Sequence, residues 1–231
     1  MKRDPSADVD PTRAAAYDER MAAEHERLAA TVAVIVLAGG ESRRFGSDKL
    51  VASFAGRTLL DHVLAGLDPS WDVICVGPPR PTERDVRWVR EEPVGGGPLA
   101  GVAAGVAATT VEVIVVIAGD MPWAGPVVPL LLDALDALDA LDALDTLDAD
   151  RGDQDVDAAR EVGAAIARDG EGHTNPLLAA YRRPALTTAL PVPAHDRPAK
   201  TLLGIPHVTV DVPGREASDV DRPSDLPDGQ A

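Results

Sequence analysis

Continuous runs of apolar, largely β-branched residues recur along the chain from residue 31 onward. Such runs are typical of strands that are buried on both faces of a parallel sheet. They predict strands at 32–37, 72–76, 86–89, 111–118, 163–168, 175–181 and 207–212. Apolar positions at helical spacing predict helices at 58–67, 99–108 and 126–148, with shorter helical stretches near 184–190 and 198–204. This alternation predicts an α/β fold: a Rossmann-like, doubly wound, mostly parallel sheet with helices on both faces.

The chain of 231 residues is long enough for one good-sized core. Residues 1–11 are polar and contain two prolines, and residues 12–30 mix alanine with charged helix formers. We therefore expect a polar tail and a peripheral helix over 1–30, one domain over 31–226, and a short tail over 227–231.

An acidic repeat interrupts this pattern at residues 131–150, which read LLDALDALDALDALDTLDAD. A step of three residues turns a helix by roughly 300°, so the leucines drift by about 60° per repeat and cannot all share one buried face. We predict a low-complexity, partly solvated extension of the helix. The alternative readings are a docking helix and a metal-binding acidic face.

The net charge of −16 argues against a nucleic-acid-binding surface, which needs a basic footprint. Residues 131–157 hold ten Asp and one Arg, a net charge of −9, so the remaining residues carry −7 and leave room for a basic pocket. No apolar run approaches the roughly 18 residues of a membrane span, and the first residues are polar, unlike a secretory signal. We expect a cytoplasmic protein with no membrane partner.

Cys75 is the only cysteine, which excludes an intrachain disulfide, and it lies in a run that predicts a buried apolar role.

The most informative loop is LAGGESRRFGSDK, residues 37–49, directly after the first predicted strand. Its three glycines allow the backbone to approach a ligand closely, and its two arginines and one lysine supply positive charge. Backbone N–H groups combined with cations can hold phosphates. The glycine spacing matches neither the P-loop nor the G-x-G-x-x-G pattern. An ordinary surface loop is the alternative.

This loop resembles the signature LAGG-x-S-x-R-M-G-x-D-K of the molybdenum cofactor guanylyltransferases, with Phe45 in place of the usual Met. Further segments resemble that family in the same order: GPLAG at 97–101, the D-x-P motif at 120–122, P-L-x-A-x-Y at 176–181, and the N-x-N-T-P-E-D-L ending at 219–226. The resemblance covers roughly residues 32–226.

The resemblance implies roles for individual residues. The backbone of Leu37, Ala38 and Gly39 would line the nucleotide, and Gly40 would leave room near the base. The cation for the triphosphate would be Lys49.

Other implied roles depart from the family's pattern or lie outside that loop. Arg43 would be a second cation for the phosphates, and Asp120 would bind both the nucleotide and Mg²⁺. Glu92, which stands where the family commonly has Asp, would contact the nucleotide. Gly77 stands where many relatives have Asn near the nucleotide and would contact it through its backbone. Asp221 replaces an Asn and would be a second metal ligand, with Asp219 a weaker candidate.

The activity that the resemblance implies is the transfer of GMP from GTP to molybdenum-bound molybdopterin, with Mg²⁺ as the cofactor and pyrophosphate as the second product. GTP and the molybdopterin acceptor would be the ligands, and molybdoenzymes or cofactor-delivery proteins would be further partners. A cytidylyltransferase or another small-molecule nucleotidyltransferase is the nearest alternative. A non-catalytic nucleotide-binding or partner-binding protein is an alternative of another class.

Overall fold

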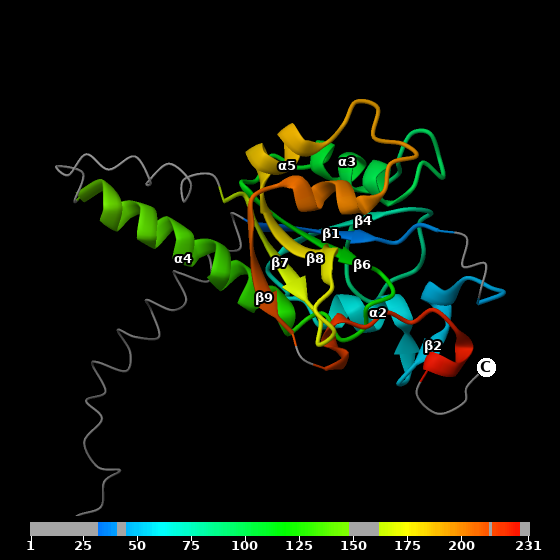
Figure 1. Cartoon of the computed structure of the whole chain (residues 1–231). Helices are drawn as coiled ribbons and strands as arrows, with labels where there is room; N and C mark the ends of the chain where they lie inside the picture. The colour runs from blue at the N-terminus through cyan, green and yellow to red at the C-terminus, as the bar shows by residue number, and fades with distance from the viewer. Residues whose placement is uncertain (1–31, 41–44, 148–161, 213, 227–231) are drawn as a thin grey trace, which may run out of the picture.

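A computed structural model describes residues 32–40, 45–147, 162–212 and 214–226. Within them a seven-stranded sheet lies between two layers of helices (Figure 1). The strand order is β5-β4-β1-β6-β8-β7-β9. The strands are β1 (Val32–Leu37), β4 (Asp72–Val76), β5 (Arg87–Val89), β6 (Val113–Ala118), β7 (Ala164–Arg168), β8 (Thr174–Arg182) and β9 (His207–Asp211). The predicted α/β fold is confirmed, while the expected helix at 12–30 lies outside the described residues.

The strand directions decide which loops meet. β1 pairs in parallel with β4 and β6, β4 pairs in parallel with β5, and β7 pairs in parallel with β9. β8 runs antiparallel between β6 and β7. The carboxyl ends of β1, β4 and β6 therefore share one edge of the sheet with the beginning of β8.

Each face of the sheet has its own core. Val32, Val34 and Val36 of β1 pack with α2 (Leu59–Ala65) and α4 (Val127–Leu147). The alternate residues Ala33 and Ile35 pack with α3 (Pro98–Ala107), α5 (Arg183–Ala189) and the 3-10 helix η4 (Ala199–Gly204). Because both faces are covered, the strand has no polar position, which explains its continuous apolar run.

The acidic repeat begins inside α4, which extends beyond the sheet (Figure 1). Leu132 and Leu135 are buried, whereas Asp133 and Asp136 are exposed. The first leucines of the repeat therefore belong to the core. The side chains beyond residue 137 lie outside the description, and with them the docking and metal-binding alternatives.

The small hairpin after the first loop was not predicted. β2 (Ser53–Phe54) and β3 (Arg57–Thr58) form a small hairpin, and the two residues between them, Ala55 and Gly56, have positive φ values of 48° and 86°. Two-residue turns of this kind match the natural twist of a hairpin. Each strand has only two residues, too few for an alternating pattern to be read from sequence.

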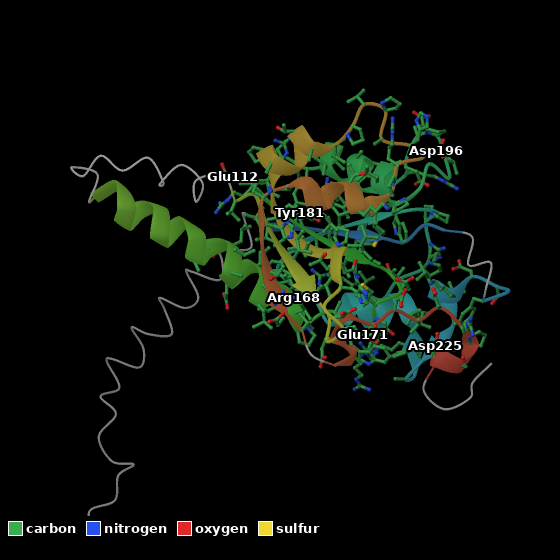
Figure 2. All side chains as sticks on the ribbon, viewed as in Figure 1. Glu112, Arg168, Glu171, Tyr181, Asp196 and Asp225 are labelled. Carbon is green, nitrogen blue, oxygen red and sulfur yellow. The ribbon has the colours of Figure 1, made fainter. Side chains whose placement is uncertain are left out.

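Cys75 and Tyr181 carry a thiol and a hydroxyl group into the two cores. Burial raises the pKa of the Cys75 thiol to about 12, in agreement with the predicted apolar role. Tyr181 of β8, labelled within the body of the molecule in Figure 2, donates its hydroxyl to the Pro176 carbonyl at 2.7 Å. None of the helices among the described residues has the length and apolar composition needed to cross a bilayer.

Candidate active site

The loops at the carboxyl ends of three parallel strands are tied together by backbone hydrogen bonds. Gly119 N–H donates to the Leu37 carbonyl at 2.9 Å, and Ala38 N–H donates to the Val76 carbonyl at 2.8 Å. A cleft of about 480 Å³ opens beyond these bonds. It is lined by Leu37, Gly39 and Gly40 after β1, by Gly95 and Gly97 before α3, and by Asp120 after β6. An open α/β sheet binds its ligands at this kind of edge.

Lys49 joins the first loop to the end of β6. Its Nζ atom lies 2.5 Å from Asp120 Oδ2 and 3.4 Å from Asp221 Oδ1, and it donates to the Val220 carbonyl at 3.0 Å. Burial lowers the pKa of Lys49, but hydrogen bonding and attraction to Asp120, with a smaller effect of Asp221, outweigh this and raise the pKa overall. The ammonium group is therefore fully charged at neutral pH and is fixed against Asp120, which lines the cleft.

Asp120, Asp219 and Asp221 form a carboxylate cluster in which one oxygen from each lies within 4.8 Å of the others. The Val220 N–H donates to the Asp120 carbonyl at 2.9 Å and holds the late segment against the end of β6. Asp225, labelled in Figure 2, accepts the N–H of Asp221 at 3.0 Å and stabilises the turn that follows. Asp219 is the exposed member of the cluster, and its pKa is raised by partial desolvation of the carboxylate and by the negative charges of Asp120 and Asp221.

The cluster has the properties of a divalent-cation site. Asp120 Oδ1 is buried and has no hydrogen-bond partner. Three like charges held this close together repel one another, and the single positive charge of Lys49 does not balance all three. Carboxylate oxygens are the ligands that Mg²⁺, Mn²⁺ and Ca²⁺ prefer. The described residues therefore fit a metal ion, and Asp219 belongs to the same cluster as the two carboxylates predicted as ligands.

The start of α3 lies at the cleft, and the helix packs closely against β1. A Cβ atom at Gly105 would lie 2.7 Å from the Ile35 side chain, so only glycine allows α3 to approach β1 this closely. Gly97 caps the helix with a φ of 86°, and Pro98 follows at its first turn. Unsatisfied N–H groups and the positive end of the helix dipole thus lie beside Gly39 and Gly40, where they favour an anion.

Arg80 holds the first loop in place and was not predicted from the sequence. Its Nε donates to Asp48 Oδ2 at 2.7 Å, and one terminal nitrogen donates to the carbonyls of Ala38 at 2.7 Å and Pro78 at 3.0 Å. Only 8% of the side chain is exposed. Asp48 also accepts the N–H of Leu50 at 3.2 Å. The only sequence signal for Arg80 is its position in the loop that follows a neighbouring parallel strand.

Ala38 and Gly77, two predicted nucleotide contacts, already use backbone groups in hydrogen bonds within the protein. Both backbone groups of Ala38 are used, by Val76 and by Arg80. Gly77 donates its N–H to Val89 at 3.0 Å, and a Cβ atom there would lie 2.4 Å from the Ala38 carbonyl oxygen. Gly77 therefore allows the second loop to press against the first.

The acidic side chain that reaches the cleft is Glu91, one residue before the predicted contact, Glu92. Glu92 is exposed, whereas Glu91 lines the cleft. Glu91 Oε1 accepts the Gly95 N–H at 3.1 Å, and Oε2 is buried without a partner. Of the other predicted residues, Leu37, Gly39, Gly40 and Asp120 line the cleft. Lys49 is not among the lining residues but contacts Asp120, and Arg43 lies outside the described residues.

Comparisons with known proteins agree with this geometry. A family model described as a MobA-like NTP transferase domain matches residues 34–210. A probable molybdenum cofactor guanylyltransferase from Haloferax mediterranei is 37% identical over 98 residues, which are 38% of this chain and 47% of that protein. A protein of the same name from Opitutus terrae is 42% identical over 104 residues, which are 41% of this chain and 50% of that protein. The chain thus spans about half the length of the curated relatives it matches.

Solved structures share the fold. Molybdopterin-guanine dinucleotide biosynthesis protein A from Archaeoglobus fulgidus is 21% identical with a TM-score of 0.55, over 85% of this chain and 96% of that one. A nucleotidyl transferase from Methanothermobacter is 21% identical with a TM-score of 0.59, over 84% and 94% of the two chains. Rv0371C from Mycobacterium tuberculosis, solved as a complex with manganese, is 16% identical with a TM-score of 0.52, over 80% and 89%.

Proposed function

The chain belongs to the MobA-like NTP transferase family, and from this premise we propose that it transfers GMP from GTP to molybdenum-bound molybdopterin and releases pyrophosphate. Curated relatives named as molybdenum cofactor guanylyltransferases support this choice of substrates. The observation that carries the proposal is the contact between Lys49 and Asp120 at 2.5 Å. It brings the cation of the glycine-rich loop and the carboxylate at the end of β6 to a single point on the edge of the sheet.

The cleft offers complementary groups to the two ends of GTP. Backbone at Gly39 and Gly40, the positive end of α3 and the Lys49 ammonium group suit the triphosphate. The Glu91 carboxylate accepts hydrogen bonds only, and the Watson–Crick edge of guanine offers N–H donors, whereas adenine offers an acceptor at N1. We propose that Glu91 favours guanine and replaces the contact assigned above to Glu92.

Transfer needs little proton chemistry. A phosphate oxygen of the acceptor forms a new bond to the α-phosphorus of GTP, the bond from that phosphorus to the bridging oxygen breaks, and its electron pair leaves with pyrophosphate. The terminal phosphate of the acceptor is largely ionised at pH 7, since its second pKa is about 6, so no general base is required. Lys49 stabilises the negative charge that develops on the departing oxygens.

We propose that Asp120, Asp219 and Asp221 hold Mg²⁺ beside Lys49. When bound there, the ion supplies Lewis-acid stabilisation of phosphate charge. The manganese complex of Rv0371C supports a divalent metal in a protein with this fold. We further propose that the reaction takes place in the cytoplasm and that molybdoenzymes or cofactor-delivery proteins receive the product.

The experiment that tests this function is pyrophosphate release measured with GTP, CTP, ATP or UTP, each with Mg²⁺, in the presence and absence of the molybdopterin acceptor. We expect release that requires both GTP and the acceptor. Release with CTP at an equal or higher rate would assign the chain to the cytidylyltransferases instead. Tight GTP binding without release under any of these conditions would favour a nucleotide-binding protein that is not an enzyme.

A further inference from the structure

A second cavity, of about 450 Å³, lies on the face of the sheet covered by α2. Its walls are the β2–β3 hairpin, α2, the turn at 122–126 and the 3-10 helix η5 (Arg215–Ala217). The side chains that bring chemistry to it are Arg57, His62, Trp123, Arg215 and Glu216. None of these residues takes part in the site described above.

Aromatic contacts hold the basic groups of this cavity in place. The Arg215 guanidinium lies over the Trp123 ring, 5.0 Å from its centroid, in a cation–π contact. Phe54 packs edge-on against Trp123 at 5.5 Å and against His62 at 4.7 Å. The cationic side chain from η5 is therefore oriented before any ligand arrives.

The cavity carries an excess of positive charge in a chain whose net charge is −16. Arg57 has only a long contact with Glu83, at 3.8 Å, and both side chains are largely exposed, so that pair is weak. Among the described residues Arg215 has no carboxylate within ion-pair distance, and Glu216 is the single opposing charge in the walls. The pKa of His62 is lowered by burial and by the positive charges of Arg57 and Arg215, so the imidazole is neutral at pH 7 and keeps one N–H donor.

The cavity is flanked by the same two segments that carry the carboxylate cluster. Asp120 is followed by Pro122 and Trp123 in the cavity wall, and Arg215 precedes Asp219. The hydrogen bond from Val220 to Asp120 joins these segments. The negative carboxylate cluster and the positive cavity therefore lie along the same two adjacent chain segments.

We propose that this second cavity is an anion site for a phosphate or phosphomonoester group, bound by Arg57 and Arg215 with His62 as an additional neutral donor. Guanidinium groups match tetrahedral phosphate oxygens with two parallel hydrogen bonds, which a lysine cannot provide. The phosphate can belong to free inorganic phosphate or to a phosphomonoester other than the acceptor, because the terminal phosphate of the acceptor must reach the α-phosphorus of GTP in the first cleft. The site itself rests on its own lining residues and does not depend on the proposed reaction.

The binding test is a titration of the full chain with inorganic phosphate, in the presence of GTP and Mg²⁺ to fill the first cleft. The indole N–H signal of Trp123 is followed by NMR and is assigned with Trp123→Phe. We expect a saturable shift, and at least about tenfold weaker binding in the Arg57→Gln/Arg215→Gln double variant, because two charged hydrogen-bonding groups are lost. The matched control is Lys200→Gln, which removes one exposed cation from η4 on the opposite face of the sheet.

A shift that never saturates, or one that is unchanged in the double variant while that variant keeps the melting temperature of the control, overturns the anion site. Titration with phenyl phosphate, a simple phosphomonoester, then separates the two sources. If phenyl phosphate binds more tightly than inorganic phosphate, the ligand is a phosphomonoester. If it does not, the ligand is free phosphate. Saturable binding without any transferase activity would keep the site and reject the proposed reaction.

Discussion

Replacing Asp120 by Asn tests the proposed site most directly, because the change removes one charge and keeps the shape of the side chain. The variant loses its attraction to Lys49, which lies 2.5 Å away, and loses one ligand of the carboxylate cluster. If the carboxylate holds a catalytic metal, its loss costs several kcal/mol in the barrier. About 4 kcal/mol corresponds to a roughly 1,000-fold lower kcat/KM.

The folded state should respond far less than the activity. At an effective dielectric constant of about 20, two unit charges 4 Å apart attract by about 4 kcal/mol, but desolvation offsets much of this gain. Lys49 keeps the Val220 carbonyl at 3.0 Å and Asp221 at 3.4 Å, and removal of one carboxylate relieves repulsion within the cluster. We therefore expect the free energy of unfolding to fall by less than about 2 kcal/mol.

Pyrophosphate release with GTP and acceptor measures the activity, and urea unfolding measures the stability. Asp211→Asn is the matched control: it also removes one Asp from an ion pair, that with Arg168, but on the exposed surface of β9. Near-normal turnover in Asp120→Asn would refute the assignment of this carboxylate. A loss of activity that only follows a loss of folded protein would show that the residue acts on stability alone.

Three further substitutions test separate parts of the argument. Gly77→Ala places a Cβ atom 2.4 Å from the Ala38 carbonyl oxygen at a φ of 148°, so the free energy of unfolding measured in urea should fall by roughly 2–4 kcal/mol. The control Gly170→Ala adds a Cβ atom in open space and should change the free energy of unfolding little. Equal values for the two variants would disprove the close approach of the two loops. Arg80→Lys keeps the positive charge but loses the forked guanidinium group that positions the first loop, so the Kd for GTP should rise about tenfold while kcat stays nearly unchanged. A lower kcat with an unchanged Kd would instead indicate that Arg80 contacts the reacting atoms directly. The raised pKa of Asp219 means that its charged form destabilises the folded state at pH values above that pKa. Asp219→Asn should therefore raise the Tm of the metal-free protein at pH 7, and this gain should disappear on acidification toward pH 4. A lower Tm of the variant at pH 7 would contradict the sign of the effect.

The sheet was predictable because its strands are covered on both faces. The run at 32–37 contains no polar residue, and the structure uses both of its alternating faces in separate cores. The edge that carries the cleft followed from strand direction, since parallel strands bring their carboxyl ends together. The sequence alone did not indicate that β8 runs antiparallel, which places its first residues, including Leu177, at the same cleft.

The remaining features depend on tertiary contacts that a local pattern does not encode. Arg80 is important because its guanidinium reaches a carbonyl 42 residues earlier in the chain. Glu91 and Glu92 are chemically identical neighbours, and the conformation of the loop decides which of them faces the cleft. The hairpin at 53–58 is too short to show a period, and it forms one wall of the second cavity.

The distant origin of the partners of Lys49 has a consequence for how the protein folds. This lysine contacts groups 171 and 172 positions later in the chain, so the region around it is closed only when nearly the whole domain has come together. Contacts of such long range form after the local ones, because the chain between them must first be ordered. A ligand that binds at the contacts of Lys49 binds only the fully folded domain. By mass action it therefore raises the free energy of unfolding of the whole domain instead of rigidifying one loop. Protection of amide hydrogens in the distant strand β7 on addition of GTP and metal would make this coupling visible.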